Sequence, residues 1–152
     1  MTARRFAPVL FACILLLAAN AQARTLYVDG ASAPGDGSSW AAPLKDVAEA
    51  LRLAADGDEV WVTAGVYTPG TERTDSFQLK PGVSVYGGFK GGETERKRRD
   101  PEANQTILSG DIGLPGPPED NVFHVVTGAD RALIDGFTIS GGYSLNARWH
   151  GP

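Results

Sequence analysis

Short apolar strand segments recur in this sequence at intervals of twenty-odd residues, and this spacing restricts the possible fold more than any other feature. The segments begin at Val60, Val83, Thr106 and Leu133, at successive intervals of 23, 23 and 27 residues, and glycine-rich turns separate them. Repeats of roughly 20 to 50 residues are typical of solenoids, in which each coil packs only against its neighbours. The sequence therefore predicts stacked coils whose strands hydrogen-bond to the coils above and below.

Two other architectures explain this pattern less well. An antiparallel sandwich needs hairpins, but no Asn-Gly or Asp-Gly pair joins two alternating strands. Asp135-Gly136 does interrupt an apolar run, yet Leu133-Ile134 before it is too short for the first half of a stable hairpin. A doubly wound α/β sheet needs a helix between successive strands, and the sequence predicts only one helix.

That helix is predicted from apolar residues that recur at i, i+3, i+4, i+7 and i+11 and so share one helical face. They are Leu44, Val47, Ala48, Leu51 and Ala55. We expect residues 56–58 to end the helix, with Gly57 in the left-handed conformation of a C-cap. The helix would cover the N-terminal end of the stacked coils and shield their open strand edges.

The N-terminus has the three parts of a secretory signal peptide in order. Arg4 and Arg5 precede an apolar run over residues 6–19, and Ala21-Gln22-Ala23 is an Ala-x-Ala cleavage site. An uncleaved membrane anchor is the alternative, but this run is shorter than the roughly 20 residues that span a bilayer. We expect cleavage after Ala23 and a processed chain without a transmembrane segment.

Composition excludes several classes of function for the processed chain. Cys13 is the only cysteine, and its position inside the apolar run does not resemble a lipid-acceptor site. Cleavage of the signal peptide would remove it, so disulfides and thiolate chemistry are excluded for the processed chain. Removing residues 1–23 takes away two arginines and no acidic residue, which moves the formal charge from −4 to −6. Nucleic acid is therefore an improbable partner. The basic segment 96–99 is flanked by acidic residues, and we expect a solvated loop there instead of an anion site.

Several segments resemble a known family. The first are Gly-Asp-Gly-Ser-Ser-Trp at residues 35–40, Pro43-Leu44, the helix through Ala50-Leu51, and the segment from Asp56 to Tyr67. Together they resemble the opening of pectin-lyase-like right-handed β-helix proteins. Residues 80–89, 106–111 and 134–142 are similar to repeats of bacterial secreted or surface β-helix proteins, including those like polymorphic outer-membrane proteins. The resemblance spans residues 25–142 and implies a mainly β, right-handed parallel β-helix with an N-terminal capping helix. It implies little about activity, because lyases, hydrolases, adhesins and passive stalks share this fold.

The expected organisation follows from these segments. Residues 1–23 form the signal peptide, 24–58 the N-terminal cap of short strand, loop and helix, 59–142 the first coils, and 143–152 an irregular tail. Proteins of this type continue with further coils, so we expect a gene product truncated after the first few coils, whose open end self-associates. The alternative is a minimal cap module that docks on another chain.

We predict no catalytic, cofactor-binding or metal-binding residue in this sequence. Nothing in the spacing of Asp111, Asp120, Asp130 and Asp135 forces them together as a calcium site, so roles in turns are expected. Asp111 and Asp135 could lie on adjacent coils as a glycosidase pair, but turn and outward positions fit them better. We expect His124 to point outward, and His150 lies in the tail.

Glycines, aromatic residues and a sequon also have ordinary explanations. The pairs Gly87-Gly88, Gly91-Gly92 and Gly141-Gly142 precede no helix, so coil corners explain them better than phosphate loops. Trp40, Trp61 and Tyr86 could stack on sugars, and Trp61 should point to the opposite face from Val60 and Val62. Packing of these rings against the cap helix is the more common arrangement. The glycosylation motif at residues 104–106 is expected to be accidental.

The function predicted from the sequence is that of an exported structural or adhesin-like surface protein, without catalysis in this part of the chain. Its expected location is secreted or at the bacterial cell surface, with polysaccharide or cell-surface components as partners. One alternative is the N-terminal part of a polysaccharide lyase or glycoside hydrolase whose catalytic residues lie on later coils. A second alternative is a carbohydrate-binding module.

Overall fold

The structure, a computed structural model, describes residues 22–144. The predicted signal peptide, apart from its last two residues, therefore lies outside the described residues, as do Cys13 and His150. So does most of the predicted tail, from residue 145 onward.

The described part of the chain is mainly β, with one α-helix. The strands are β1 (Thr25–Val28), β2 (Glu59–Thr63), β3 (Gly65–Tyr67), β4 (Phe77–Gln78), β5 (Ser84–Phe89), β6 (Thr106–Ser109), β7 (Val126–Thr127), β8 (Leu133–Asp135) and β9 (Phe137–Ser140). The helix is α1 (Val47–Leu53), and two 3-10 turns lie at η1 (Arg96–Arg98) and η2 (Pro118–Asp120).

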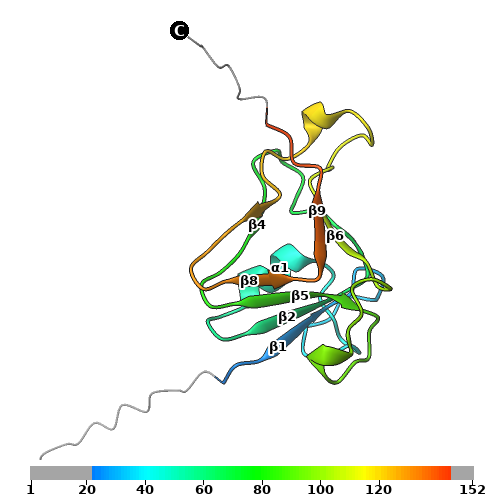
Figure 1. Cartoon of the computed structure of the whole chain (residues 1–152), viewed down its shortest axis with the longest axis vertical. Coiled ribbons are helices and arrows are strands. Elements are labelled where there is room, and N and C mark those ends of the chain that lie inside the picture. Colours follow the sequence, from blue (N-terminus) through cyan, green and yellow to red (C-terminus); the bar gives the residue numbers. More distant parts are fainter. Residues whose placement is uncertain (1–21, 145–152) are drawn as a thin grey trace, which may run out of the picture.

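The strands form three sheets, and every named pair within them is parallel. The first sheet has the order β1-β2-β5-β8, the second β3-β6-β9, and the third β4-β7. From β2 onward the chain visits the three sheets in the same order on each round. Viewed in Figure 1, the sheets form the sides of a triangle, with α1 inside its outline.

The register corrects the spacing that the sequence suggested. Val60 pairs with Val85, 25 residues later, and Val85 pairs with Ile134, 49 residues later. Thr106 belongs to the second sheet, opposite Gly65 and Phe137, and is not equivalent to Val60. The intervals vary because long loops, such as those between β5 and β6 and between β6 and β7, separate strands of one round. The regular interval in the sequence was therefore not the length of a coil.

Helix α1 is shorter than the predicted segment from Leu44 to Ala55. The Asp46 carboxylate caps its N-terminus by accepting from Glu49 N–H, at 2.7 Å. Leu44 is extended instead, because its backbone bonds to Tyr27 and Asp29 beside β1. The helix also ends earlier than predicted, at Leu53, and its C-cap is Ala54 in an extended conformation instead of Gly57. Gly57 has the predicted positive φ, +90°, but in the turn that follows.

The main core lies inside the triangle, and α1 contributes to it. Val28, Val60 and Val62 are fully buried, together with Phe77 from the third sheet and Leu108 from the second. Val47, Ala50 and Leu51 of α1 join the same cluster, and the helix contacts β1, β2 and β4. Each buried aliphatic side chain contributes roughly 1.5–3 kcal/mol, so this shared interior holds the three sheets together.

A second, aromatic cluster covers the outer face of the first sheet. Trp61, Tyr86 and Phe89 are buried there, with Tyr27 and Trp40 packed against them. The Trp61 and Phe89 rings stack at 4.7 Å between centroids, with an interplanar angle of 11°. Trp61 therefore differs from Val60 and Val62 in direction, as predicted, but it is only 6% exposed and offers no face to a sugar.

The last strands of the first and second sheets are less covered than the others. Leu133 on β8 is 42% exposed and Ile139 on β9 is 50% exposed. Between residues 22 and 144, no strand pairs with the outer edges of β8 and β9. Within the same residues, no helix has the length and apolar character needed to cross a bilayer.

Candidate functional site

The outer face of the third sheet has two hollows that share Ser76 and Gln78. The first, of about 270 Å³, lies between α1 and β4 and is lined by Ala48, Leu51, Arg52, Ser76, Gln78 and Lys80. The second, of about 370 Å³, is lined by Thr74, Ser76, Gln78, Phe123, His124, Thr127 and Ser144. The aromatic cluster that covers the first sheet has no member on this face among residues 22–144. It is therefore the candidate binding surface of the described chain.

Alternation along the strands places uncharged polar groups on this face. Phe77 of β4 is fully buried, so Gln78 beside it points outward, and Thr127 lies opposite Gln78 on β7. Ser76 Oγ lies 2.7 Å from Thr127 Oγ1, and Gln78 Nε2 donates to Ser76 Oγ at 2.5 Å. These bonds fix the side chains in a row across the two strands.

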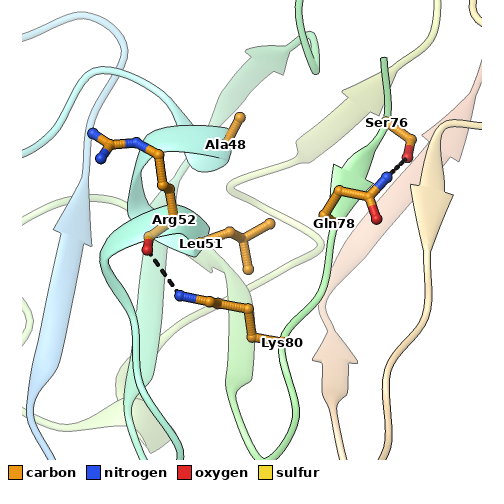
Figure 2. A pocket seen from close by; sticks show the side chains of 6 residues that line it. All are labelled: Ala48, Leu51, Arg52, Ser76, Gln78 and Lys80. Carbon is orange, nitrogen blue, oxygen red and sulfur yellow. Dashed lines mark hydrogen bonds between the residues drawn. The ribbon is translucent and has the colours of Figure 1, made fainter. Parts of the chain in front are cut away.

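The first hollow has an apolar floor and a basic end (Figure 2). Ala48 and Leu51 of α1 face it, and Lys80 lies at one end. Lys80 Nζ donates to the carbonyl oxygens of Arg52 and Ala54, at 2.8 and 2.7 Å. Lysine thereby satisfies carbonyls at the C-terminal end of α1 and holds the helix beside β4.

The second hollow combines an aromatic ring with hydrogen-bonding groups. Phe123 is 37% exposed, and the Arg73 guanidinium lies 4.4 Å from the centre of its ring. His124 is exposed at the rim, which confirms the predicted outward direction. None of the residues lining the two hollows is a carboxylate, so their chemistry is suited to hydrogen bonding and stacking.

The basic segment 96–99 is held by acidic partners. Arg96 pairs with Glu59 and Arg99 with Asp135, at 2.5 and 2.6 Å, while Lys97 and Arg98 both pair with Glu95. Arg96 and Arg99 also lie against the ring of Tyr86. Lys97 and Arg98 are largely exposed, in agreement with a solvated loop, but Arg96 and Arg99 fasten that loop to the first sheet.

The predicted carboxylate positions separate into different parts of the fold. Asp135 is on β8 in the first sheet and pairs with Arg99, whereas Asp111 follows β6 of the second sheet, so the structure does not bring them together as a glycosidase pair. Asp130 lies in the turn before β8. Asp111 and Asp120 both belong to the loop between β6 and β7. Among residues 22–144, no three His, Cys, Asp or Glu side chains are grouped so that they could hold a metal.

The remaining predictions concern the sequon and the paired glycines. Thr106 of the sequon is 1% exposed, and its hydroxyl donates to the Thr63 carbonyl at 3.2 Å, so this side chain has a structural role. Gly87 and Gly88 lie inside β5, where the register with β2 shifts, so the predicted coil corner at this pair is wrong. Gly88 has φ +93°, and a Cβ there would lie 2.7 Å from Pro101, so this irregularity requires glycine. The polar row on the third sheet was missed, because β4 is too short to give a periodic signal.

Residues 28–150 match a family described as "Protein of unknown function (DUF1565)". The chain belongs to this family. The DUF1565 match includes α1, strands β2 to β9 and both hollows of the third sheet. No curated protein and no solved structure matches the chain.

Proposed function

We propose that this DUF1565 chain forms the first turns of a right-handed parallel β-helix of the pectin-lyase-like kind, with α1 as its N-terminal cap. The constant order in which the chain visits three parallel sheets supports this proposal. So does the contact of α1 with β1, β2 and β4, the strands nearest one end of the stack. The cap would protect the edges of the first strands from pairing with other chains.

Its proposed role is structural or adhesin-like, within an exported protein at the bacterial cell surface. The observation that carries this role is the open edge of β8 and β9, where Leu133 and Ile139 are exposed. A further parallel coil can pair with these strands and bury those side chains, because each coil of a solenoid packs on its neighbours. Without such a coil, the same edge is a site for self-association.

Fractionation of a bacterial host that expresses the full chain tests export. We expect the protein outside the cytoplasm, with Arg24 as its first residue after cleavage following Ala23. A variant with Arg4 and Arg5 replaced by glutamate should remain in the cytoplasm. Retention of the wild-type chain in the cytoplasm with its N-terminus intact would contradict the proposal.

Carbohydrate binding is a second candidate function, supported by the outer face of the third sheet. Gln78 and Thr127 supply uncharged hydrogen-bonding groups, and His124 a further one, beside the partly exposed ring of Phe123. Such groups match the hydroxyls and the apolar face of a neutral sugar. The described residues give no comparable support to a lyase or a hydrolase.

Retention on immobilised neutral polysaccharides tests this second function. Gln78→Ala and Phe123→Ala should each shorten retention, whereas Gln105→Ala, an exposed glutamine outside both hollows, should leave it unchanged. Equal retention of all three variants and the wild type would exclude this face as the binding surface.

A further inference from the structure

Three buried side-chain atoms in the described residues have no hydrogen-bond partner, and all three are oxygens of one loop. They are Asp111 Oδ1, Asp120 Oδ1 and Asn121 Oδ1. The loop runs between β6 and β7, and Val122 N–H donates to the Gly110 carbonyl at 2.9 Å. That bond joins the two ends of the loop, so Asp111, at its beginning, lies next to Asp120 and Asn121, at its end.

Hydrogen bonds within the loop hold one of the two carboxylates and the backbone at the start of the loop. Asp120 Oδ2 accepts from Leu114 N–H at 2.8 Å, which turns the carboxylate back into its own loop. Gly113 packs against the same carboxylate, since a Cβ on Gly113 would lie 2.0 Å from Asp120 Oδ2. Asp111 N–H donates to Ser109 Oγ at 3.1 Å. The three unpaired oxygens therefore belong to a loop whose ends are joined and whose carboxylate Asp120 is fixed by a bond within the loop.

Asn121 gives an observation independent of the two carboxylates. Asn121 is only 8% exposed. Its backbone N–H donates to the Pro118 carbonyl, and its own carbonyl accepts from Arg73 Nε. The side-chain oxygen is buried and has no hydrogen-bond partner. A buried polar atom without a partner costs roughly 1–3 kcal/mol, so three in one loop indicate a bound group.

We propose that this loop binds a calcium ion through Asp111, Asp120 and Asn121. All three free atoms are acceptors, so the bound group must donate hydrogen bonds or carry positive charge. Carboxylate and amide oxygens are the ligands that calcium prefers, and backbone carbonyls and water complete its shell of 6 to 8 oxygens. Magnesium fits less well, because it requires near-ideal octahedral geometry. The ion would fix the loop between the second and third sheets.

Calorimetric titration of the chelator-treated full chain with calcium chloride tests the site. We expect one ion per chain with a Kd of roughly 10⁻⁴ to 10⁻³ M, the range of extracellular calcium modules. Calcium should also slow proteolysis within residues 112–119, and magnesium at the same concentration should do so less.

Variants assign the binding to these three residues. Asp111→Asn combined with Asp120→Asn should weaken calcium binding roughly tenfold or more, since ligand charge sets affinity. Asn121→Asp keeps the oxygen and adds charge, so it should tighten binding, and it remains informative if the double variant does not fold. Asp130→Asn, in the turn before β8, is the control and should bind as the wild type does. Absence of calcium binding by the wild type, or equal binding by all variants, would overturn the proposal and indicate an enclosed water instead.

Discussion

The buried carboxylate of Asp58 accepts hydrogen bonds from both the backbone N–H and the side chain of Arg24, at 3.0 and 3.2 Å. It also accepts from Ala55 N–H at 2.9 Å, and Arg24 Nη2 donates to the Leu53 carbonyl at 2.7 Å. Asp58 is 4% exposed. This one carboxylate therefore joins the segment before β1 to the end of α1 and to the start of β2.

Replacing Asp58 with asparagine should destabilise the fold by about 2 kcal/mol, because an amide nitrogen cannot accept the bonds that the carboxylate accepts. Denaturation by urea measures the loss. Asp56→Asn is the matched control: its carboxylate pairs with Arg131 at the surface, so its loss should cost less than about 1 kcal/mol. Equal losses in the two variants would show that Asp58 does not join these segments.

Stability should decrease in acid, and Asp58 should account for part of the decrease. Burial raises the pKa of Asp58, but hydrogen bonds from Arg24 and Ala55 and the charge of Arg24 outweigh it and leave the pKa below the usual 3.8. The unfolded chain then binds a proton at Asp58 more readily than the folded chain does. This stabilisation is therefore complete at pH values above the ordinary pKa of 3.8 and is lost as the pH falls through the lower pKa of the folded state. Urea denaturation between about pH 7 and 3 should show a smaller acid loss for Asp58→Asn than for the wild type. Parallel curves would contradict this assignment.

Signal cleavage after Ala23 should strengthen the contact between Arg24 and Asp58. The Arg24 nitrogen that now donates as a backbone N–H would become a charged α-amino group beside a buried carboxylate. The bond already ends on a charged carboxylate, and a charged donor adds Coulombic attraction between the two groups. A chain that begins at Arg24 should therefore have a higher urea midpoint than the same chain with an acetylated N-terminus. The difference should disappear in the Asp58→Asn background, and a difference that persists there would assign the effect elsewhere.

The aromatic cluster on the first sheet should be as important for stability as the interior. Trp61→Ala removes the ring that stacks on Phe89 and should cost roughly 3–5 kcal/mol. Val66 on β3, the next strand along the chain, is 66% exposed, so Val66→Ala should change the free energy of unfolding by less than about 0.5 kcal/mol. Thermal unfolding followed by circular dichroism compares the two. A cost near that of Val66→Ala would mean that the cluster does not hold the loops onto the sheet.

Local patterns predicted the mainly β composition, the single helix and the positive φ of Gly57, because each depends on residues close together in the sequence. The helix start was misplaced because Leu44 fits the helical period but bonds to β1, a tertiary contact that periodicity does not include. The equivalence of Val60 and Thr106 failed for a similar reason. An even interval between strands does not reveal which sheet each strand joins.

The surroundings of the side chains were harder to predict than the strands. Trp61 was expected to pack against the cap helix, with an exposed ring as the alternative, yet it stacks on Phe89. Trp40, from a distant segment, packs on the same Phe89 ring. Asp111 and Asp120 were expected in turns and do lie in the loop between β6 and β7. Sequence spacing does not show that the bond between Gly110 and Val122 brings the two ends of this loop together. Contacts between segments decide both cases.

The central claim is that successive rounds of the chain stack as parallel strands, and cysteine cross-linking in the second sheet tests it most directly. Val66 lies opposite Ile107, and Ile107 lies opposite Thr138. With Cys13 replaced by serine, a short thiol cross-linker should join the pairs Val66→Cys with Ile107→Cys and Ile107→Cys with Thr138→Cys rapidly. It should join Val66→Cys with Thr138→Cys, two strands apart, much more slowly. Rapid reaction of the outer pair with slow reaction of both adjacent pairs would contradict the stacking.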